Sequence, residues 1–309
     1  AEDTQGHIWI GTFRGLNKNN VHDYHQYFCT DDSLGLPDNQ ITHLLRDSKN
    51  RFWVGTVNGV CLYTDKDNFR IIPIEADNKN VRQILEDRNG RIFLNTGFQL
   101  YAYHPREEKI TCVLPEISPG NAFYAQCHIA PDNNLWVMTS TGLRCYDPST
   151  LQLKESVALS GYPYYSYLHN NELWITGNHT LSIFDTRTHS FKPLPQPIAH
   201  NTTLCNADID YIHPYGNNGL LLNTARHGMF YYNPGTGSVT RQDENGFPFE
   251  MPRFRISRMF TDSQQNLWIG SVDQGYTVCY HYKERFNNDN YLRSELNNKS
   301  VVSLSAGKD

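Results

Sequence analysis

A short segment centred on a large hydrophobic residue recurs seven times along the 309 residues, and this repeat limits the possible folds more than any other feature. The seven central residues are Trp9, Trp53, Phe93, Trp136, Trp174, Leu221 and Trp268. The spacings between them are 44, 40, 43, 38, 47 and 47 residues. A period that drifts in this way is typical of four-stranded propeller blades with variable loops, whereas stacked solenoid repeats need a stricter length.

The second repeat shows how each unit divides into four short strands. We predict these strands over 41–46, 52–56, 60–63 and 69–74. The first turn begins with Asp47, whose carboxylate can accept hydrogen bonds from the backbone that follows it. Gly59 marks the second turn, where a positive φ costs glycine little. Seven such units, with no helical pattern of useful length, predict an all-β fold: a seven-bladed β-propeller of four-stranded blades that occupies residues 1–309 as a single domain.

The two ends of the chain complement each other in the phase of this repeat. Residues 301–306 resemble a first strand, and nothing that resembles a second strand follows them. The N-terminal repeat begins at its first turn, with Asp3, and so lacks a first strand. We therefore expect a composite blade built from about residues 1–34 and 300–309. Pairing of the C-terminal strand with the N-terminal blade would remove the open sheet edges.

Composition argues against several classes of protein. The 27 Lys and Arg residues and 32 Asp and Glu residues give a net charge of −5 and are spread without runs, so we expect no nucleic-acid partner. No apolar stretch is long enough to span a membrane, and we expect no membrane contact by this segment. The seven Cys include no C-x-x-C pair, and the thirteen His lack paired ligand spacing. We therefore predict no metal site and no cofactor.

Three segments carry a resemblance to a known family. They are the opening Trp9–Asn17, the second repeat with its preceding linker Leu36–Ile41, and the seventh repeat around Trp268. Their Asp turn, Trp-Ile/Val-Gly core and following Gly resemble the regulator-propeller repeats in sensors of hybrid two-component systems. The resemblance covers nearly the whole chain and fades at the fifth and sixth repeats, where Leu221 replaces the aromatic residue.

The resemblance implies a non-catalytic sensory domain in the periplasm. Sensors of this family respond to oligosaccharides released from complex glycans, and their output is a histidine kinase. The chain would then be a fragment of a larger sensor. Its expected partners are an oligosaccharide ligand, a second propeller and an immunoglobulin-like module of the same parent chain, and a second copy in a homodimer of the full-length sensor.

Two alternatives to a sensor remain open from the residues themselves. Propellers also host glycoside hydrolases, which need two carboxylates across the cleaved bond, and polysaccharide lyases, which need a His, Tyr or Arg base. Most Asp residues are assigned to turns, and no short motif indicates a base, so we predict no catalytic residue. The second alternative is a scaffold that binds only other protein modules.

A ligand site is expected on the face that carries the turns between second and third strands, because the loops between blades lie on the same face. A sugar site needs flat aromatic surface and planar polar groups that pair with hydroxyls. The candidate residues at these turns are Arg14, Phe98, His179, Arg226, His227 and Asp273. Solvation alone could also explain polar turn tips. The aromatic segment 161–165 could face a ligand or pack in the core.

Overall fold

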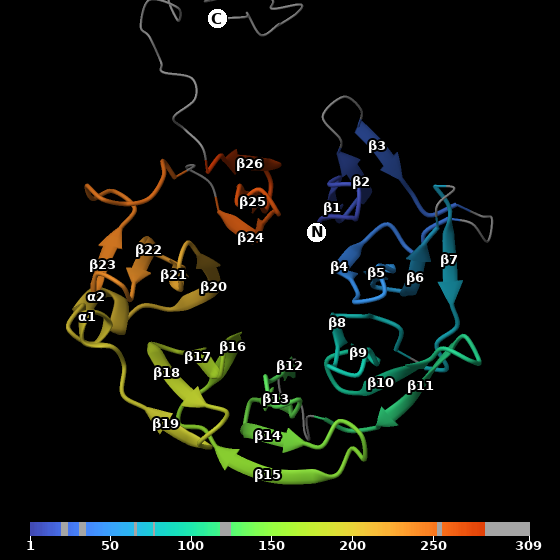
Figure 1. The fold of residues 1–309 in the computed structure, drawn as a ribbon, viewed down its shortest axis with the longest axis horizontal. Coiled ribbons are helices and arrows are strands. Elements are labelled where there is room, and N and C mark those ends of the chain that lie inside the picture. The colour runs from blue at the N-terminus through green and yellow to red at the C-terminus, as the bar shows by residue number, and fades with distance from the viewer. Residues whose placement is uncertain are drawn as a thin grey trace, which may run out of the picture.

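The computed structural model describes residues 1–19, 24–30, 35–64, 67–76, 78–117, 125–251 and 255–281. Within these residues, seven separate antiparallel sheets stand around a ring (Figure 1). Each sheet is one blade, and its first strand lies nearest the centre, with later strands following outward. The predicted seven-bladed, all-β propeller is confirmed.

The strands follow the chain from blade to blade around the ring. Blades 1 to 3 contain β1 (Ile8–Thr12), β2 (Gly15–Asn19) and β3 (Tyr24–Tyr27); β4 (Ile41–Arg46), β5 (Phe52–Thr56), β6 (Gly59–Tyr63) and β7 (Phe69–Ile72); and β8 (Gln83–Glu86), β9 (Ile92–Asn95), β10 (Leu100–His104) and β11 (Lys109–Leu114). Blades 4 and 5 contain β12 (Gln126–Ile129), β13 (Leu135–Thr139), β14 (Gly142–Tyr146) and β15 (Leu153–Ala158); and β16 (Pro163–His169), β17 (Glu172–Gly177), β18 (Thr180–Asp185) and β19 (Ser190–Lys192). Blades 6 and 7 contain β20 (Ile209–Tyr215), β21 (Gly219–Thr224), β22 (Gly228–Asn233) and β23 (Ser238–Arg241); and β24 (Ile256–Thr261), β25 (Leu267–Ser271) and β26 (Tyr276–Cys279).

Two single-turn helices lie in the connection from blade 5 to blade 6. They are α1 (Gln196–Ala199) and α2 (Thr202–Cys205), and they bury Ile198 and Leu204 in the core cluster that blades 5 and 6 share. In the part of the chain that the structure describes, no helix is long and apolar enough to cross a membrane.

The hydrophobic core lies between neighbouring blades. Trp53 of blade 2, for example, packs in one cluster with Ile84 and Leu94 of blade 3. The central residue of the repeat is fully buried in six blades, and Trp268 of blade 7 is half-buried. Each repeat therefore depends on its neighbour for burial of its largest side chain, which is why the repeats assemble as a ring.

The Asp that opens the first turn explains the spacing of six residues to the central Trp. The Asp47 carboxylate accepts hydrogen bonds from the Lys49 and Arg51 backbone N–H groups, at 3.0 and 2.8 Å, and from Trp53 Nε1 at 2.8 Å. Trp9 Nε1 and Trp268 Nε1 donate in the same way to Asp3 and Asp262, whereas Asp87 precedes Phe93 and accepts from its turn backbone and from the Arg91 guanidinium. One buried carboxylate thus holds both the turn and the core side chain.

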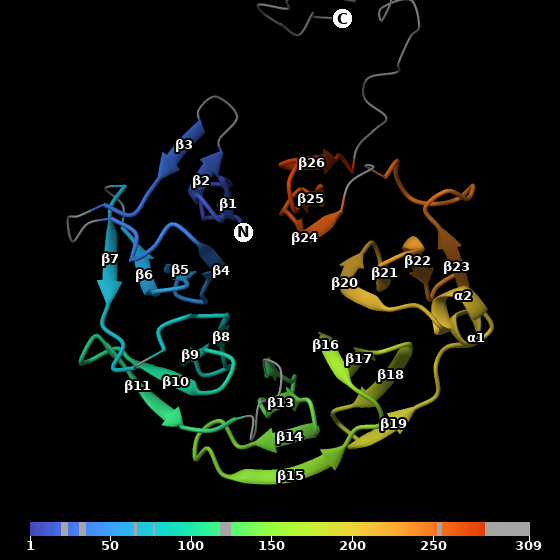
Figure 2. The ribbon, with the colours of Figure 1, turned by 180° about the vertical axis from the view of Figure 1, so that it is seen from behind.

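The contact between blades 7 and 1 has the same form as the contact between blades 2 and 3. Ser48, which follows the Asp of blade 2, donates its backbone N–H to the Glu86 carboxylate of blade 3 at 2.7 Å. Ser263 of blade 7 donates in the same way to Glu2 of blade 1, also at 2.7 Å. Figures 1 and 2 show these two ends of the described chain side by side. The ring therefore continues from its last blade to its first with one repeated interblade contact.

The predicted closing strand, 301–306, lies outside the described residues. Among the described residues, the start of β1 pairs with the first residues of the chain, since Trp9 donates its backbone N–H to the Ala1 carbonyl at 2.7 Å and Glu2 bridges Ile8. These two residues occupy the place of the last two residues of an inner strand, which sequence reasoning did not assign to them.

Candidate ligand-binding face

The turns between second and third strands are closed by the last residue of the second strand. The Thr56 hydroxyl donates to the Gly59 carbonyl at 3.0 Å and accepts from the Asn58 backbone N–H at 3.2 Å. The equivalent residues Thr12, Thr139 and Thr224 make the same pair of bonds. Because each turn satisfies its own backbone, its tip side chains can vary between blades without disturbing the fold.

The loops between blades lie on the same face as these turns, as the sequence predicts. Gly15 donates its backbone N–H to the Asn39 carbonyl at 2.8 Å, and Val57 donates to Gln40 at 3.1 Å. Both acceptors belong to the loop that connects blade 1 to blade 2. Turn tips and interblade loops therefore form one continuous face of the propeller, which we call the ligand face.

The inner strands of four blades bulge where they approach the ligand face. The ladder shifts register at Thr42, Tyr164, Asp210 and Ser257, one residue in each of blades 2, 5, 6 and 7. Such bulges bend a strand and re-aim the extra side chain, and they recur next to functional sites. Tyr164 is 40% exposed, and Asp210 is also exposed. The bulges thus add a variable polar or aromatic side chain at the inner end of each of these blades.

Blades 5 and 6 bring several polar groups together on this face. The exposed His179, in the left-handed region with φ 52, donates its backbone N–H to Asp208 at 3.0 Å. Its Nδ1 lies 2.9 Å from the Asn206 carbonyl and 3.3 Å from Asp208 Oδ1. Asn223 Nδ2 donates to Asp210 at 2.6 Å. The turn of blade 5 and the loop before β20 therefore hold Asp208 beside the His179 imidazole, and Asn223 holds Asp210 at the start of β20.

The electrostatics of this cluster reflect partial burial. Burial raises the pKa of Asp210 above its usual range although the Asn223 amide opposes the shift. Burial, together with the charges of Asp208 and Asp210, raises the pKa of Tyr164 to about 12. Tyr164 is thus a neutral hydroxyl at physiological pH, beside carboxylates that accept hydrogen bonds. Such an arrangement can pair with the hydroxyl groups of a neutral ligand.

All six predicted site residues lie on the ligand face, although they are distributed over five blades. His179 belongs to the cluster of blades 5 and 6, and Arg226 and His227 form the exposed turn tip of blade 6. The other tips carry Arg14 on blade 1, Phe98 on blade 3 and Asp273 on blade 7. The structure leaves their role in binding as a prediction.

Sequence reasoning missed two members of the cluster, Asp208 and Asp210. Asp208 sits in the loop before β20, and Asp210 is the extra residue of a bulge, so neither occupies a turn that the repeat pattern marks. The aromatic segment 161–165 was a sequence candidate, and Tyr162 and Tyr164 are indeed exposed, at 66% and 40%. Together with Phe98, at 41%, they give this face exposed ring surface.

Comparison with known proteins supports the resemblance found in the sequence. Residues 35–58, which hold the linker, β4, the Asp turn and β5 of blade 2, match the family model described as two component regulator propeller. The chain carries a regulator-propeller repeat. The resemblance is therefore confirmed at the repeat where the sequence motif is clearest. A comparison with curated protein sequences gives no match.

Solved structures share the fold of this chain. The extracellular domain of a hybrid two component system from B. thetaiotaomicron is 18% identical, with TM-score 0.71, over 90% of this chain and 39% of that one. The extracellular domain of a one component system from the same organism is 22% identical, with TM-score 0.69, over 90% and 37%. Virginiamycin B lyase from Staphylococcus aureus is 15% identical, with TM-score 0.64, over 87% and 89%. The chain thus spans about two fifths of the sensor domains but nearly all of the lyase.

Proposed function

We propose that this chain is a non-catalytic, extracytoplasmic sensory domain of a hybrid two-component histidine kinase, located in the periplasm. The observation that carries the proposal is the regulator-propeller repeat at residues 35–58, in a fold shared with the extracellular domains of two such systems. Within the parent sensor the propeller would take part in assembly with a second propeller, an immunoglobulin-like module and a second copy of the sensor.

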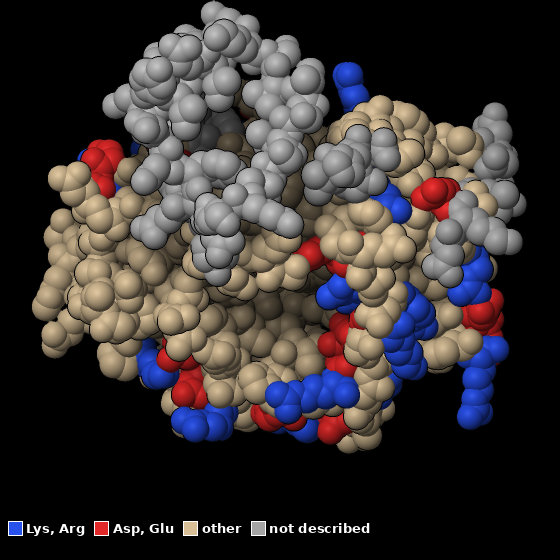
Figure 3. Space-filling view, turned by 45° about the horizontal axis from the view of Figure 1, so that its top comes forward, with Lys and Arg blue, Asp and Glu red and all other residues tan. Residues whose placement is uncertain are grey.

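The ligand proposed for the sensor is an oligosaccharide derived from a complex glycan, bound at the ligand face. Exposed rings such as Tyr164 can stack on sugar rings, while Asp208, Asp210 and His179 can pair with hydroxyl groups. Figure 3 shows acidic and basic side chains interspersed on the surface, with the centre of the ring hollowed. This mixture of charges favours a neutral polyhydroxylated ligand over a polyanion.

The test is calorimetry of the complete extracellular region of the parent protein against a panel of oligosaccharides. Once a ligand binds, Asp210→Asn and Tyr164→Ala should weaken it about ten- to a hundred-fold, because each lost contact is worth about 1.5–3 kcal/mol. Arg226→Ala and His227→Ala test the turn tip of blade 6 in the same way. The matched control is Arg187→Ala, an exposed residue of the β18–β19 turn on the opposite face. Unchanged affinity in all four ligand-face variants would exclude this face as the binding site.

A propeller enzyme is the second candidate, since the fold is shared along nearly the whole length of virginiamycin B lyase. A glycoside hydrolase would release reducing ends from polysaccharides, and a polysaccharide lyase would release unsaturated sugars. We expect the purified chain to release neither. Activity that copurifies with the protein and disappears on changing one Asp, His or Tyr would replace the sensory proposal. If calorimetry detects no oligosaccharide binding and the chain releases no sugar, while the sensor still assembles, the protein–protein scaffold would be the function that remains.

A further inference from the structure

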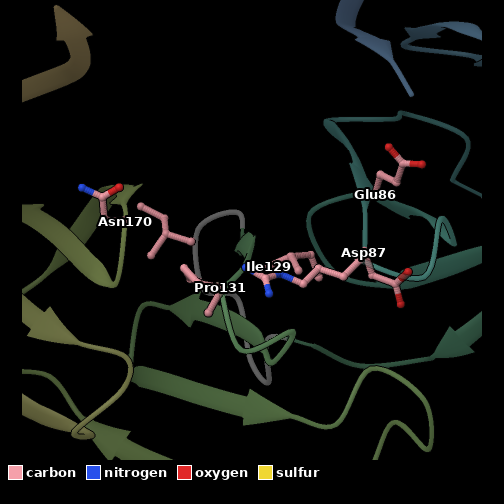
Figure 4. A pocket seen from close by; sticks show the side chains of 8 residues that line it. Glu86, Asp87, Ile129, Pro131 and Asn170 are labelled. Carbon is pink, nitrogen blue, oxygen red and sulfur yellow. The ribbon is translucent and has the colours of Figure 1, made fainter. Parts of the chain in front are cut away.

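A cavity of about 400 Å³ opens on the face opposite the ligand face. It is lined by Glu86 and Arg88 of blade 3, Ile129 and Pro131 of blade 4, and Leu168 and Asn170 of blade 5. Glu86 and Asn170 lie on opposite sides of it, with Ile129 and Pro131 between them (Figure 4). Its volume lies within the range of small-molecule sites in proteins.

The cavity lies at blades 4 and 5, which are two of the three blades whose first turn lacks the Asp. The third is blade 6, where Tyr215 stands six residues before Leu221. Blades 1, 2, 3 and 7 carry a turn opened by Asp. Blade 4 has Ala130 at this place, because Ala130 N donates to Asn134 O just as Asp47 N donates to Arg51 O. In blade 5 only two residues, 170–171, separate β16 from β17. The first turns beside the cavity therefore differ from those of blades 1, 2, 3 and 7.

Blades 4 and 5 hold three of the five buried side-chain polar atoms that have no hydrogen-bond partner among the described residues. Trp136 Nε1, Trp174 Nε1 and His169 Nε2 are buried and have no hydrogen bond to any described residue. In blade 2, Trp53 Nε1 donates to Asp47, whereas blade 4 has Ala130, which lines the cavity, at the place of Asp47. This sector thus lacks the acceptor that Asp3, Asp47 and Asp262 supply to Trp Nε1 in blades 1, 2 and 7.

The polar side chains around the cavity differ in whether other residues of the protein already form hydrogen bonds with them. Glu86 accepts from Ser48, and Asp87 accepts from its turn and from Arg91. By contrast, neither the Arg88 guanidinium nor the Asn170 carboxamide has a side-chain partner among the described residues. Two hydrogen-bond donors therefore remain available beside an apolar surface formed by Ile129, Pro131 and Leu168.

We propose that this cavity binds a neutral N-acetylated sugar through its acetamido group. The acetamido carbonyl accepts from Arg88 or Asn170, its methyl group packs on Pro131 and Leu168, and ring hydroxyl groups donate to Glu86. An anionic sugar would meet the carboxylates of Glu86 and Asp87, and a sugar without the acetamido group would leave the two donors and the apolar surface unmatched. The proposal concerns a site separate from the ligand face and does not depend on it.

The experiment is an NMR titration of this chain with N-acetylglucosamine, and with glucose and glucuronic acid as comparison ligands. We expect binding of N-acetylglucosamine in the millimolar range, as suits an open site, and at least about tenfold weaker binding of the other two. Arg88→Ala should weaken N-acetylglucosamine at least about tenfold. Asn170→Ala should weaken it in the same direction.

The matched control is Arg46→Ala, which removes an exposed Arg from the end of the inner strand of blade 2, outside the cavity. It should bind like the parent chain, and all variants should melt at the same temperature. Tighter binding of glucuronic acid would make the site an anion site and overturn the proposal. So would the absence of N-acetylglucosamine binding, or binding that Arg88→Ala leaves unchanged. Because the ligand-face variants lie elsewhere, these outcomes leave the sensory proposal untouched.

Discussion

The turns on the two faces of the propeller differ in how similar they are from one blade to the next. On the face of the first turns, the same residue type returns in blade after blade: Asp3, Asp47, Asp87 and Asp262 each accept backbone hydrogen bonds from their own turn. On the ligand face, only the closing hydroxyl and glycine recur, and the tips differ in every blade. Seven copies within one chain thus serve as an internal comparison. What they share holds the blade together, and what they vary is available for contacts with other molecules.

The largest effect is expected from removing one of the recurring carboxylates. The Asp47 side chain is fully buried and also pairs with Arg51, at 2.6 Å between Nε and Oδ2. Asp47→Ala would leave Arg51, Trp53 and two backbone N–H groups without their acceptor. We expect a loss of about 3–5 kcal/mol in the free energy of unfolding, measured by urea denaturation. Asp132→Ala, in the blade 4 turn that lacks this buried carboxylate, should cost clearly less; an equal loss would contradict the structural role assigned to the repeat.

The sequence predicted the repeated face well because its signals are local. Strands β4 and β5 begin and end at the predicted residues, since polar turn residues mark both ends of each hydrophobic segment. The ligand face was also predicted, because strand order alone decides which turns share a face. Asp210 could not be predicted, since a bulge depends on the register between two strands rather than on a sequence motif. The cavity beside Ala130 depends on how three blades meet, which no single repeat specifies.

Three buried histidines on the inner strands should make the free energy of unfolding depend on pH. His43, His128 and His213 lie on inner strands, and burial lowers the pKa of each from 6.5 to about 4. The Ile84 backbone N–H of blade 3 donates to His43 Nδ1 at 3.3 Å. His128 Nε2 lies 2.8 Å from Ser166 Oγ and His213 Nε2 lies 2.9 Å from Thr261 Oγ1, so all three rings connect neighbouring blades.

Because the unfolded chain binds protons that the folded chain does not, stability is fully present above the unfolded pKa and is lost as pH falls from about 6.5 to 4. Each His should contribute about 1.4 kcal/mol per pH unit in that window. Urea denaturation at several pH values measures how steeply the free energy of unfolding changes with pH. His128→Gln should reduce this slope by about 1.4 kcal/mol per pH unit, the contribution of one His. A slope that His128→Gln leaves unchanged would show that other groups cause the acid sensitivity.

A comparison of two buried tryptophans can separate the stabilisation that comes from the Asp carboxylate from the stabilisation that comes from packing. Trp53 and Trp136 are both fully buried, but only Trp53 donates to a carboxylate, whereas Trp136 Nε1 is without a partner among the described residues. Replacement by Phe removes ring volume at both sites and a charge-assisted hydrogen bond at one. Trp53→Phe should therefore cost about 1.5–3 kcal/mol more in the free energy of unfolding than Trp136→Phe. Equal costs in calorimetric melts would mean that the recurring Asp serves its turn and not the core.

The smallest effect is expected at the ligand face, where blade 7 offers a matched pair of carboxylates. Asp262 is 7% exposed and accepts from the Gln264 and Asn266 backbone N–H groups and from Trp268 Nε1. Asp273 lies exposed in the next turn along the same blade, and its own backbone N–H contacts the Ser271 hydroxyl at 3.3 Å. Asp273→Ala removes a solvated side chain from a turn that Ser271 already supports, so the free energy of unfolding should change by less than about 0.5 kcal/mol. Asp262→Ala should instead cost about 3–5 kcal/mol, as at Asp47. Both variants are compared by urea denaturation at neutral pH. If Asp273→Ala destabilised the fold as much as Asp262→Ala, the ligand face would be part of the framework, and its variation between blades would no longer indicate a surface kept for binding.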